Sequence, residues 1–158
     1  EALPQASRYI TKVELWSKNK LNYPNCIYED EAVFFPLLAL SKNIILINEV
    51  YFKYRIDRPD SVTNRKPDTK HALGYLHIIN FIIEFMKKNP ELVKLDLSAW
   101  RYRLSRNGLK YISMCMITNT NISLKMIVIL SLNVKSLKYP FKLLWRVLKF
   151  FIIKFLNK

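Results

Sequence analysis

The chain has 158 residues, of which 51% are hydrophobic, and it contains only two glycines. This length and composition fit one folded domain with its own core and exclude a disordered or collagen-like chain. The net charge of +14 is concentrated in residues 91–158, which carry 13 Lys/Arg against two acids, whereas residues 1–90 carry 13 Lys/Arg against 10 acids. We therefore expect the C-terminal part to meet an anionic partner: phospholipid headgroups, nucleic acid or a polyanionic substrate.

The N-terminal part of the sequence predicts short elements of mixed type. Residues 7–18 have apolar spacings that suit a short amphipathic helix. The acids at 29–31 are typical of the positive N-terminal end of a helix and predict a second helix there. Pro36 would either kink this helix or lie in its first turn. The β-branched and aromatic runs at 43–47 and 49–56 predict strands.

The rest of the chain predicts helices. One begins at Asp68 and ends at Asn89-Pro90, and a second covers residues 91–117, with Asn107-Gly108 as a candidate interruption. After a loop with Ser123 or Asn121 as N-cap, two further apolar stretches are predicted to be helical, at 124–134 and 139–156.

The cysteines and histidines give no metal-binding pattern. Cys26 and Cys115 are far apart, which favours two buried, reduced thiols in a cytoplasmic protein and leaves one disulfide as the alternative. His71 and His77 do not share a helix face, so a paired metal site is not expected. Because the chain begins with Glu1, we expect either a processed protein or a piece of a longer polypeptide.

The most informative segment is residues 24–63, PNCIYEDEAVFFPLLALSKNIILINEVYFKYRIDRPDSVT. A proline turn leads to the pair Glu29-Asp30, and a helix, the run IILI, the run YFKYR at 51–55 and the loop SVT at 61–63 follow. In this order the elements resemble the C-terminal half of the catalytic domain of family 2 glycosyltransferases of the GT-A type. The approach at 13–16 and 21–23 is similar as well, so the resemblance covers about the first 40% of the chain.

The resemblance implies an α/β-derived fragment that is mostly α, with short strands from the C-terminal half of a GT-A domain. Residues 1–66 would be the acceptor-side part of that domain, and residues 67–158 a helical C-terminal region. The resemblance further implies an inverting glycosyltransferase in bacterial surface polysaccharide synthesis. Its partners would be a nucleotide-sugar donor and a glycan or lipid-linked acceptor, and a homo-oligomer stays open.

The resemblance also assigns residues to roles. Asp30 would be the base that takes the proton of the acceptor hydroxyl, with Glu29 as its neighbour; the alternative is that both are only helix N-terminal acids. Arg55 and Arg58, with Ser61 in the loop that follows, would bind the donor diphosphate or an anionic acceptor, and the alternative is a solvated strand end.

The donor-binding half of such an enzyme is not visible in the sequence. There is no DxD motif and no glycine-rich phosphate loop. We therefore expect the divalent metal of the full-length enzyme, Mg or Mn, to have its ligands outside this chain. We also expect the fragment alone to be inactive.

The C-terminal residues 139–158 combine lysines and arginine with a broad apolar face that includes Trp145. This pattern predicts a basic amphipathic helix in peripheral contact with the inner face of the cell membrane. The alternative is that the helix packs on the helices at 68–88 and 91–117 or on another copy.

If the glycosyltransferase resemblance is misleading, the chain would be a basic helical module without a catalytic role. It would then bind a membrane surface or nucleic acid, and nucleic acid is not favoured because the aromatic residues lie in the apolar sector.

Overall fold

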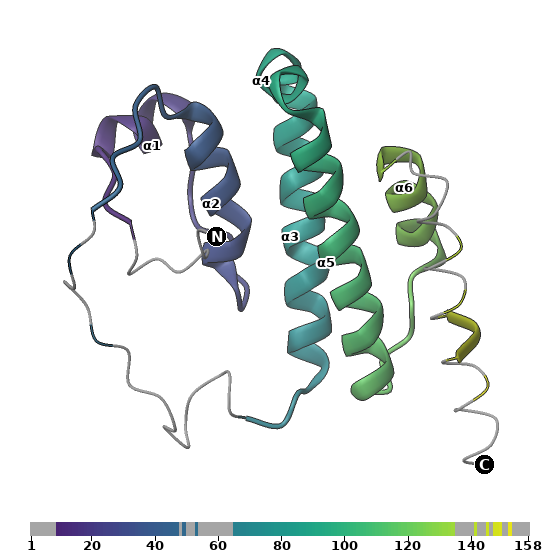
Figure 1. The fold of residues 1–158 in the computed structure, drawn as a ribbon. Coiled ribbons are helices and arrows are strands. Elements are labelled where there is room, and N and C mark those ends of the chain that lie inside the picture. Colours follow the sequence, from purple (N-terminus) through teal and green to yellow (C-terminus); the bar gives the residue numbers. More distant parts are fainter. Residues whose placement is uncertain are drawn as a thin grey trace.

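A computed structural model describes residues 9–47, 49, 53, 65–134, 141, 145, 147–149 and 152. Within these residues the elements are helices α1 to α6, joined by turns and loops, and none of these residues forms a strand (Figure 1). The described part is therefore all-α. The expectation of an α/β-derived fragment with short strands is wrong.

The β-branched run at 43–47, which predicted a strand, does not form one, and the structure shows the reason. Residues 43–47 have no regular secondary structure, and the apolar side chains at 44–47 are between 59% and 90% exposed. A β-branched run is stable as a strand when it pairs with a neighbour and buries one face, and no described residue offers such a partner. Of the predicted strand at 49–56, only Glu49 and Lys53 are described, and neither is in a strand.

The two N-terminal helices are short. α1 (Val13–Asn19) starts later than predicted and ends where Lys20 adopts a left-handed conformation. α2 (Glu29–Leu40) carries its three acids in the first turn, as predicted. Pro36 lies inside α2 and is buried there, so it is not a first-turn proline.

The predicted helix after Asp68 is confirmed as α3 (Thr69–Lys88). The Asp68 carboxylate accepts a hydrogen bond from the backbone N–H of Lys70 at 2.9 Å, and the side chain of His71 completes a capping box. Asn89 ends α3, and Pro90 takes the first position of α4 (Pro90–Leu95), where its missing N–H is harmless.

The long C-terminal stretch is interrupted at a different residue from the one predicted. The break lies at Asp96, between α4 and α5 (Leu97–Ile117), whereas Asn107 and Gly108 are buried inside α5. Asp96 caps α5 by accepting the Ala99 N–H at 3.0 Å. α6 (Leu124–Val134) is confirmed, and Ser123 caps it by accepting the Met126 N–H at 3.3 Å.

Helices α3 and α5 run antiparallel through the centre of the molecule (Figure 1). α2 packs on α3, α6 packs on α5, and α4 closes one end of the pair. The fully buried side chains include Val33 from α2, Ile78, Ile79 and Ile82 from α3, Leu104 and Ile112 from α5, and Leu130 from α6. The core thus combines residues from both sides of the predicted boundary at residue 66.

In the part of the chain that the structure describes, no helix has both the length and the apolar character needed to cross a bilayer.

Candidate functional site

The turn before α2 is anchored on α3 by close packing. Tyr28 adopts a left-handed conformation with φ of 66°, and its ring stacks on Tyr75 with centroids 4.9 Å apart. Gly74 lets the backbone approach, because a Cβ there would lie 2.8 Å from the carbonyl oxygen of Ile27. This packing fixes where the first turn of α2 begins, and with it the position of the two predicted catalytic acids.

The three acids of this first turn occupy different environments. Glu29 is exposed, and Asp30 is half-buried, with its Oδ1 accepting the backbone N–H of Glu31 at 2.8 Å. Glu31 is buried and accepts hydrogen bonds from Lys110 Nζ at 3.0 and 3.1 Å. Its carboxylate also lies 4.0 Å from the guanidinium of Arg103. Glu31 therefore ties α2 to α5, whereas Glu29 and Asp30 keep part of their surface exposed to solvent.

Aromatic side chains from the N-terminal segment lie beside this turn. The hydroxyls of Tyr9 and Tyr23 are 3.2 Å apart, and the ring of Tyr23 contacts that of Trp16 at 5.0 Å between centroids. The Trp16 indole N–H donates to the Thr11 hydroxyl at 2.6 Å, which fixes the ring. Tyr9 also packs on Phe34 of α2 at 5.5 Å.

The aromatic residues and the acids share one electrostatic environment. Burial raises the pKa of Tyr9 well above its ordinary value, and the hydrogen bond to Tyr23 and the charges of Asp30 and Glu29 raise it further. Burial also raises the pKa of the Cys26 thiol, to which the charge of Glu29 adds. We call Tyr9, Trp16, Tyr23, Glu29 and Asp30 the acidic–aromatic cluster.

The acidic–aromatic cluster has two chemical capacities. A carboxylate that is half-buried but reachable can accept a proton from a bound hydroxyl. An aromatic ring offers an apolar face on which the C–H side of a sugar ring can lie, while a phenol hydroxyl hydrogen-bonds to the sugar's rim. Reasoning from the sequence missed Tyr9. The one available signal was Tyr23, which immediately precedes Pro24 and the turn to the acids.

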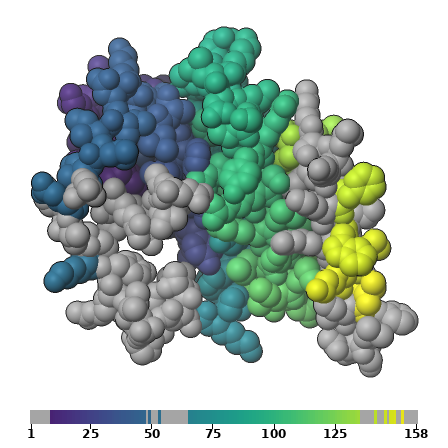
Figure 2. Space-filling view, viewed as in Figure 1, coloured from purple at the N-terminus to yellow at the C-terminus, as the bar shows by residue number. Residues whose placement is uncertain are grey.

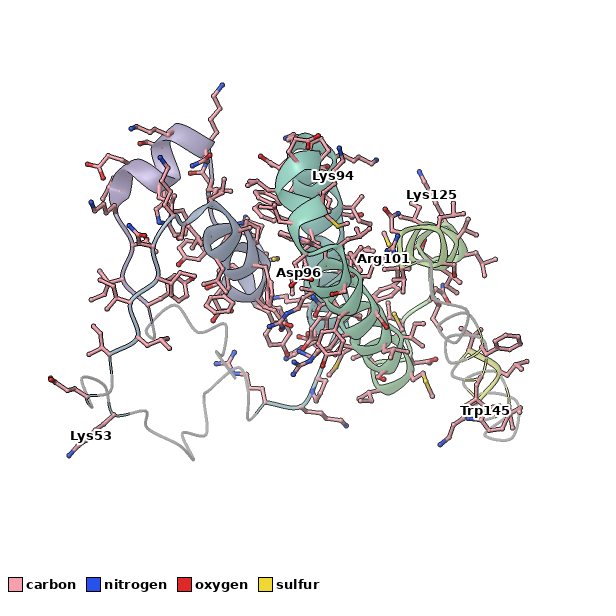
Figure 3. The ribbon with its side chains drawn as sticks, turned by 45° about the horizontal axis from the view of Figure 1, so that its top comes forward. Lys53, Lys94, Asp96, Arg101, Lys125 and Trp145 are labelled. Carbon is pink, nitrogen blue, oxygen red and sulfur yellow. The ribbon has the colours of Figure 1, made fainter. Side chains whose placement is uncertain are left out.

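The structure does not describe the remaining predicted site residues. Arg55, Arg58 and Ser61 lie outside the described residues, and Lys53, the last residue described before them, is exposed (Figure 3). Their role in substrate binding stays a prediction.

The two cysteines and two histidines are all described, and they differ in burial. Cys26 and Cys115 are both free; Cys115 is buried, as predicted, but Cys26 is only half-buried. His71 is buried in the capping box, and His77 is exposed on α3. Across the described ranges no group of three or more His, Cys, Asp or Glu side chains could hold a metal ion. The resemblance places the ligands of the divalent metal outside this chain; that stays a prediction, and no step is assigned to the metal.

Comparison with known proteins returned no matching family model, no matching curated protein and no matching solved structure. The interpretation of the acidic–aromatic cluster therefore depends on its own chemistry and on the motif order in residues 24–63.

Proposed function

We propose that this chain is the acceptor-side part of an inverting glycosyltransferase, in which Asp30 is the general base. The observation that carries the proposal is the half-buried Asp30 carboxylate at the start of α2, whose charge acts on Tyr9 of the Tyr9–Tyr23 hydroxyl pair; the ring of Tyr23 in turn contacts Trp16. The order of motifs around Glu29-Asp30 supports the same assignment.

The proposed reaction is a single displacement. The acceptor hydroxyl gives its proton to the Asp30 carboxylate as its oxygen bonds to the anomeric carbon of the donor sugar. The bond from that carbon to the nucleoside diphosphate breaks at the same time, and the diphosphate leaves with the electron pair. A positioned base of this kind contributes about 10²- to 10⁴-fold to the rate. Glu29 is the exposed neighbour, and it would hold acceptor hydroxyls or tune the local charge.

The surroundings of the three acids narrow the choice of base. Glu31 is engaged by Lys110 and lies near Arg103, so its carboxylate has a structural task. Glu29 is exposed to water, which weakens its interactions with a substrate. Asp30 combines access with partial burial, which favours directed proton transfer.

The proposed acceptor site is testable on the 158-residue chain alone by NMR titration with methyl glycosides of glucose, galactose and N-acetylglucosamine. We expect at least one glycoside to shift the amide signals of residues 23 and 29–31. Tyr23→Ala should weaken that binding about tenfold, because the variant loses one aromatic face. Tyr102→Ala is the matched control, since Tyr102 is an exposed tyrosine on α5. Shifts that are absent with all three sugars, or equal losses in both variants, would contradict the site.

A further inference from the structure

The C-terminal residues that the structure describes present a narrow apolar stripe to solvent. Phe141, Trp145, Leu148 and Ile152 are helical and between 47% and 74% exposed. At about 100° per residue, they fall within an arc of about 60° on one helix face. Val147, on another face of the same stretch, packs against the core. The stripe therefore points away from the protein that the helix rests on.

Helix α6 repeats this arrangement. Leu124, Val128 and Leu132 recur every fourth residue and are between 57% and 72% exposed. The buried residues of α6 are on its other side, and they are Met126, Leu130 and Val134. An amphipathic helix normally buries its apolar face, so a helix with one buried and one outward apolar stripe has a second surface to cover. We call the two sets of outward residues the α6 stripe and the C-terminal stripe.

Both stripes lie on the same side of the molecule. Figure 1 places α6 and the described C-terminal residues beyond α5, on the side opposite to α1 and α2. Figure 2 shows the C-terminal side chains in yellow along that edge. The acidic–aromatic cluster belongs to the N-terminal segment and α2, so a partner bound at the stripes would leave it open.

Positive charge accompanies each stripe. Lys125, which Figure 3 labels, follows Leu124, and Lys149 follows Leu148; both lysines are exposed. The region 91–158 has 13 Lys/Arg against two acids, a net charge of +11. Bulky apolar side chains, a tryptophan and neighbouring lysines are the combination that suits the boundary between lipid headgroups and acyl chains. A second copy of this chain would bring the same positive charge to the contact, which disfavours self-association at this surface.

We infer that the α6 stripe and the C-terminal stripe dock the protein on an anionic lipid surface, with their apolar side chains inserted and Lys125 and Lys149 at the headgroups. The docking is peripheral and independent of the proposed sugar transfer. Its strength depends on both terms: anionic headgroups attract the basic region, and the apolar stripes gain by leaving water.

The test uses the full 158-residue chain and vesicle flotation. Vesicles of phosphatidylcholine with about one third phosphatidylglycerol should bind the protein. Vesicles of pure phosphatidylcholine should bind it at least about tenfold more weakly. Trp145 is the exposed tryptophan, whereas Trp100 is buried, so binding should shift the fluorescence emission to the blue. Trp145→Phe should retain binding and lose that shift.

Variants separate the contribution of the apolar side chains from that of the lysine charges, and they provide controls. Phe141→Ser with Leu148→Ser should reduce partitioning about tenfold or more, and Leu124→Ser with Val128→Ser should also reduce it. The charge reversals Lys125→Glu and Lys149→Glu should reduce binding to the anionic vesicles while leaving the fold intact, as circular dichroism would show. Ile10→Ser with Leu46→Ser removes apolar groups at the α1–α2 side that are even more exposed, and it should leave binding unchanged.

Three outcomes would overturn the inference. One is equal binding to anionic and neutral vesicles. Another is a loss of binding in the Ile10/Leu46 control that matches the loss in the stripe variants. In the third, the stripe variants still bind vesicles, but they no longer self-associate, as measured by light scattering, or no longer bind single-stranded DNA. That third result would assign the surface to a second copy or to nucleic acid.

Discussion

The carboxylate of Glu31 accepts hydrogen bonds from Lys110 Nζ at 3.0 and 3.1 Å, although 79 positions separate the two residues. The contact joins the first turn of α2 to the middle of α5. The guanidinium of Arg103 lies 3.6 Å from the ring centroid of Phe35 and 4.0 Å from Glu31, so α2 meets two cations from one face of α5. The helix that carries Asp30 is therefore held by charge as well as by its apolar face.

Removing the Glu31 charge should destabilise the protein. Glu31→Gln keeps the shape of the side chain but removes the charge that the buried Arg103 and the half-buried Lys110 face. We expect the free energy of unfolding in urea to fall by about 1–3 kcal/mol, less than for a fully buried pair because Lys110 is partly solvated. In a double-mutant cycle with Lys110→Met, the two losses should be clearly less than additive. Additive losses would mean that the contact contributes nothing specific.

Adding one methyl group at Gly74 should disturb the turn that precedes the acids. Gly74→Ala gains helix propensity, but the new Cβ would lie 2.8 Å from both Cγ1 and the carbonyl oxygen of Ile27. Because a backbone oxygen cannot move as a side-chain end can, we expect a net loss of about 1–2 kcal/mol in stability. Amide signals of residues 26–30 should shift in NMR spectra. Leu73→Ala, at an exposed neighbouring position, should leave those signals in place.

The cap of α3 should make stability depend on pH in the acid range. The hydrogen bond to His71 lowers the pKa of Asp68 below its ordinary value of 3.8, and the N–H of Lys70 lowers it further. A lowered folded-state pKa stabilises the fold above the unfolded-state value, and the stabilisation is lost as the pH falls through the folded-state value. At about pH 6, the Asp68→Asn variant should therefore have a lower Tm than the parent chain. The difference between the two Tm values should become smaller below pH 3.8. A gap that widens on acidification would contradict this cap.

The helices with strong local signals were predictable. α3 has an aspartate N-cap, a continuous apolar period and an Asn-Pro stop, and each of these acts within a few residues. The break at Asp96 was not expected, because the apolar pattern continues on both sides and the cap depends on one carboxylate that meets Ala99. Gly108 looked like an interruption, yet it is buried inside α5, where tertiary packing outweighs its low helix propensity.

The predicted strands and most of the acidic–aromatic cluster depended on partners that a sequence does not show. Residues 43–47 have the composition of a strand, but β propensity expresses a fit to neighbouring strands, and the described part of the chain supplies none. Tyr9 reaches Tyr23 over 14 positions, and Glu31 reaches Lys110 over 79, so neither contact leaves a periodic signal. Local signals predicted where the acids are, and long-range packing decided which acid is structural.

The central claim is that Asp30 takes the proton of an acceptor hydroxyl. The direct measurement is sugar transfer by the polypeptide that joins this chain to a nucleotide-sugar-binding region, comparing Asp30→Asn with Glu14→Gln, an exposed acid on α1. We expect Asp30→Asn to lower kcat about 10²- to 10⁴-fold and to leave the KM for the donor within about twofold, whereas Glu14→Gln should have no effect. An Asp30→Asn variant that transfers sugar at the parent rate would contradict the account.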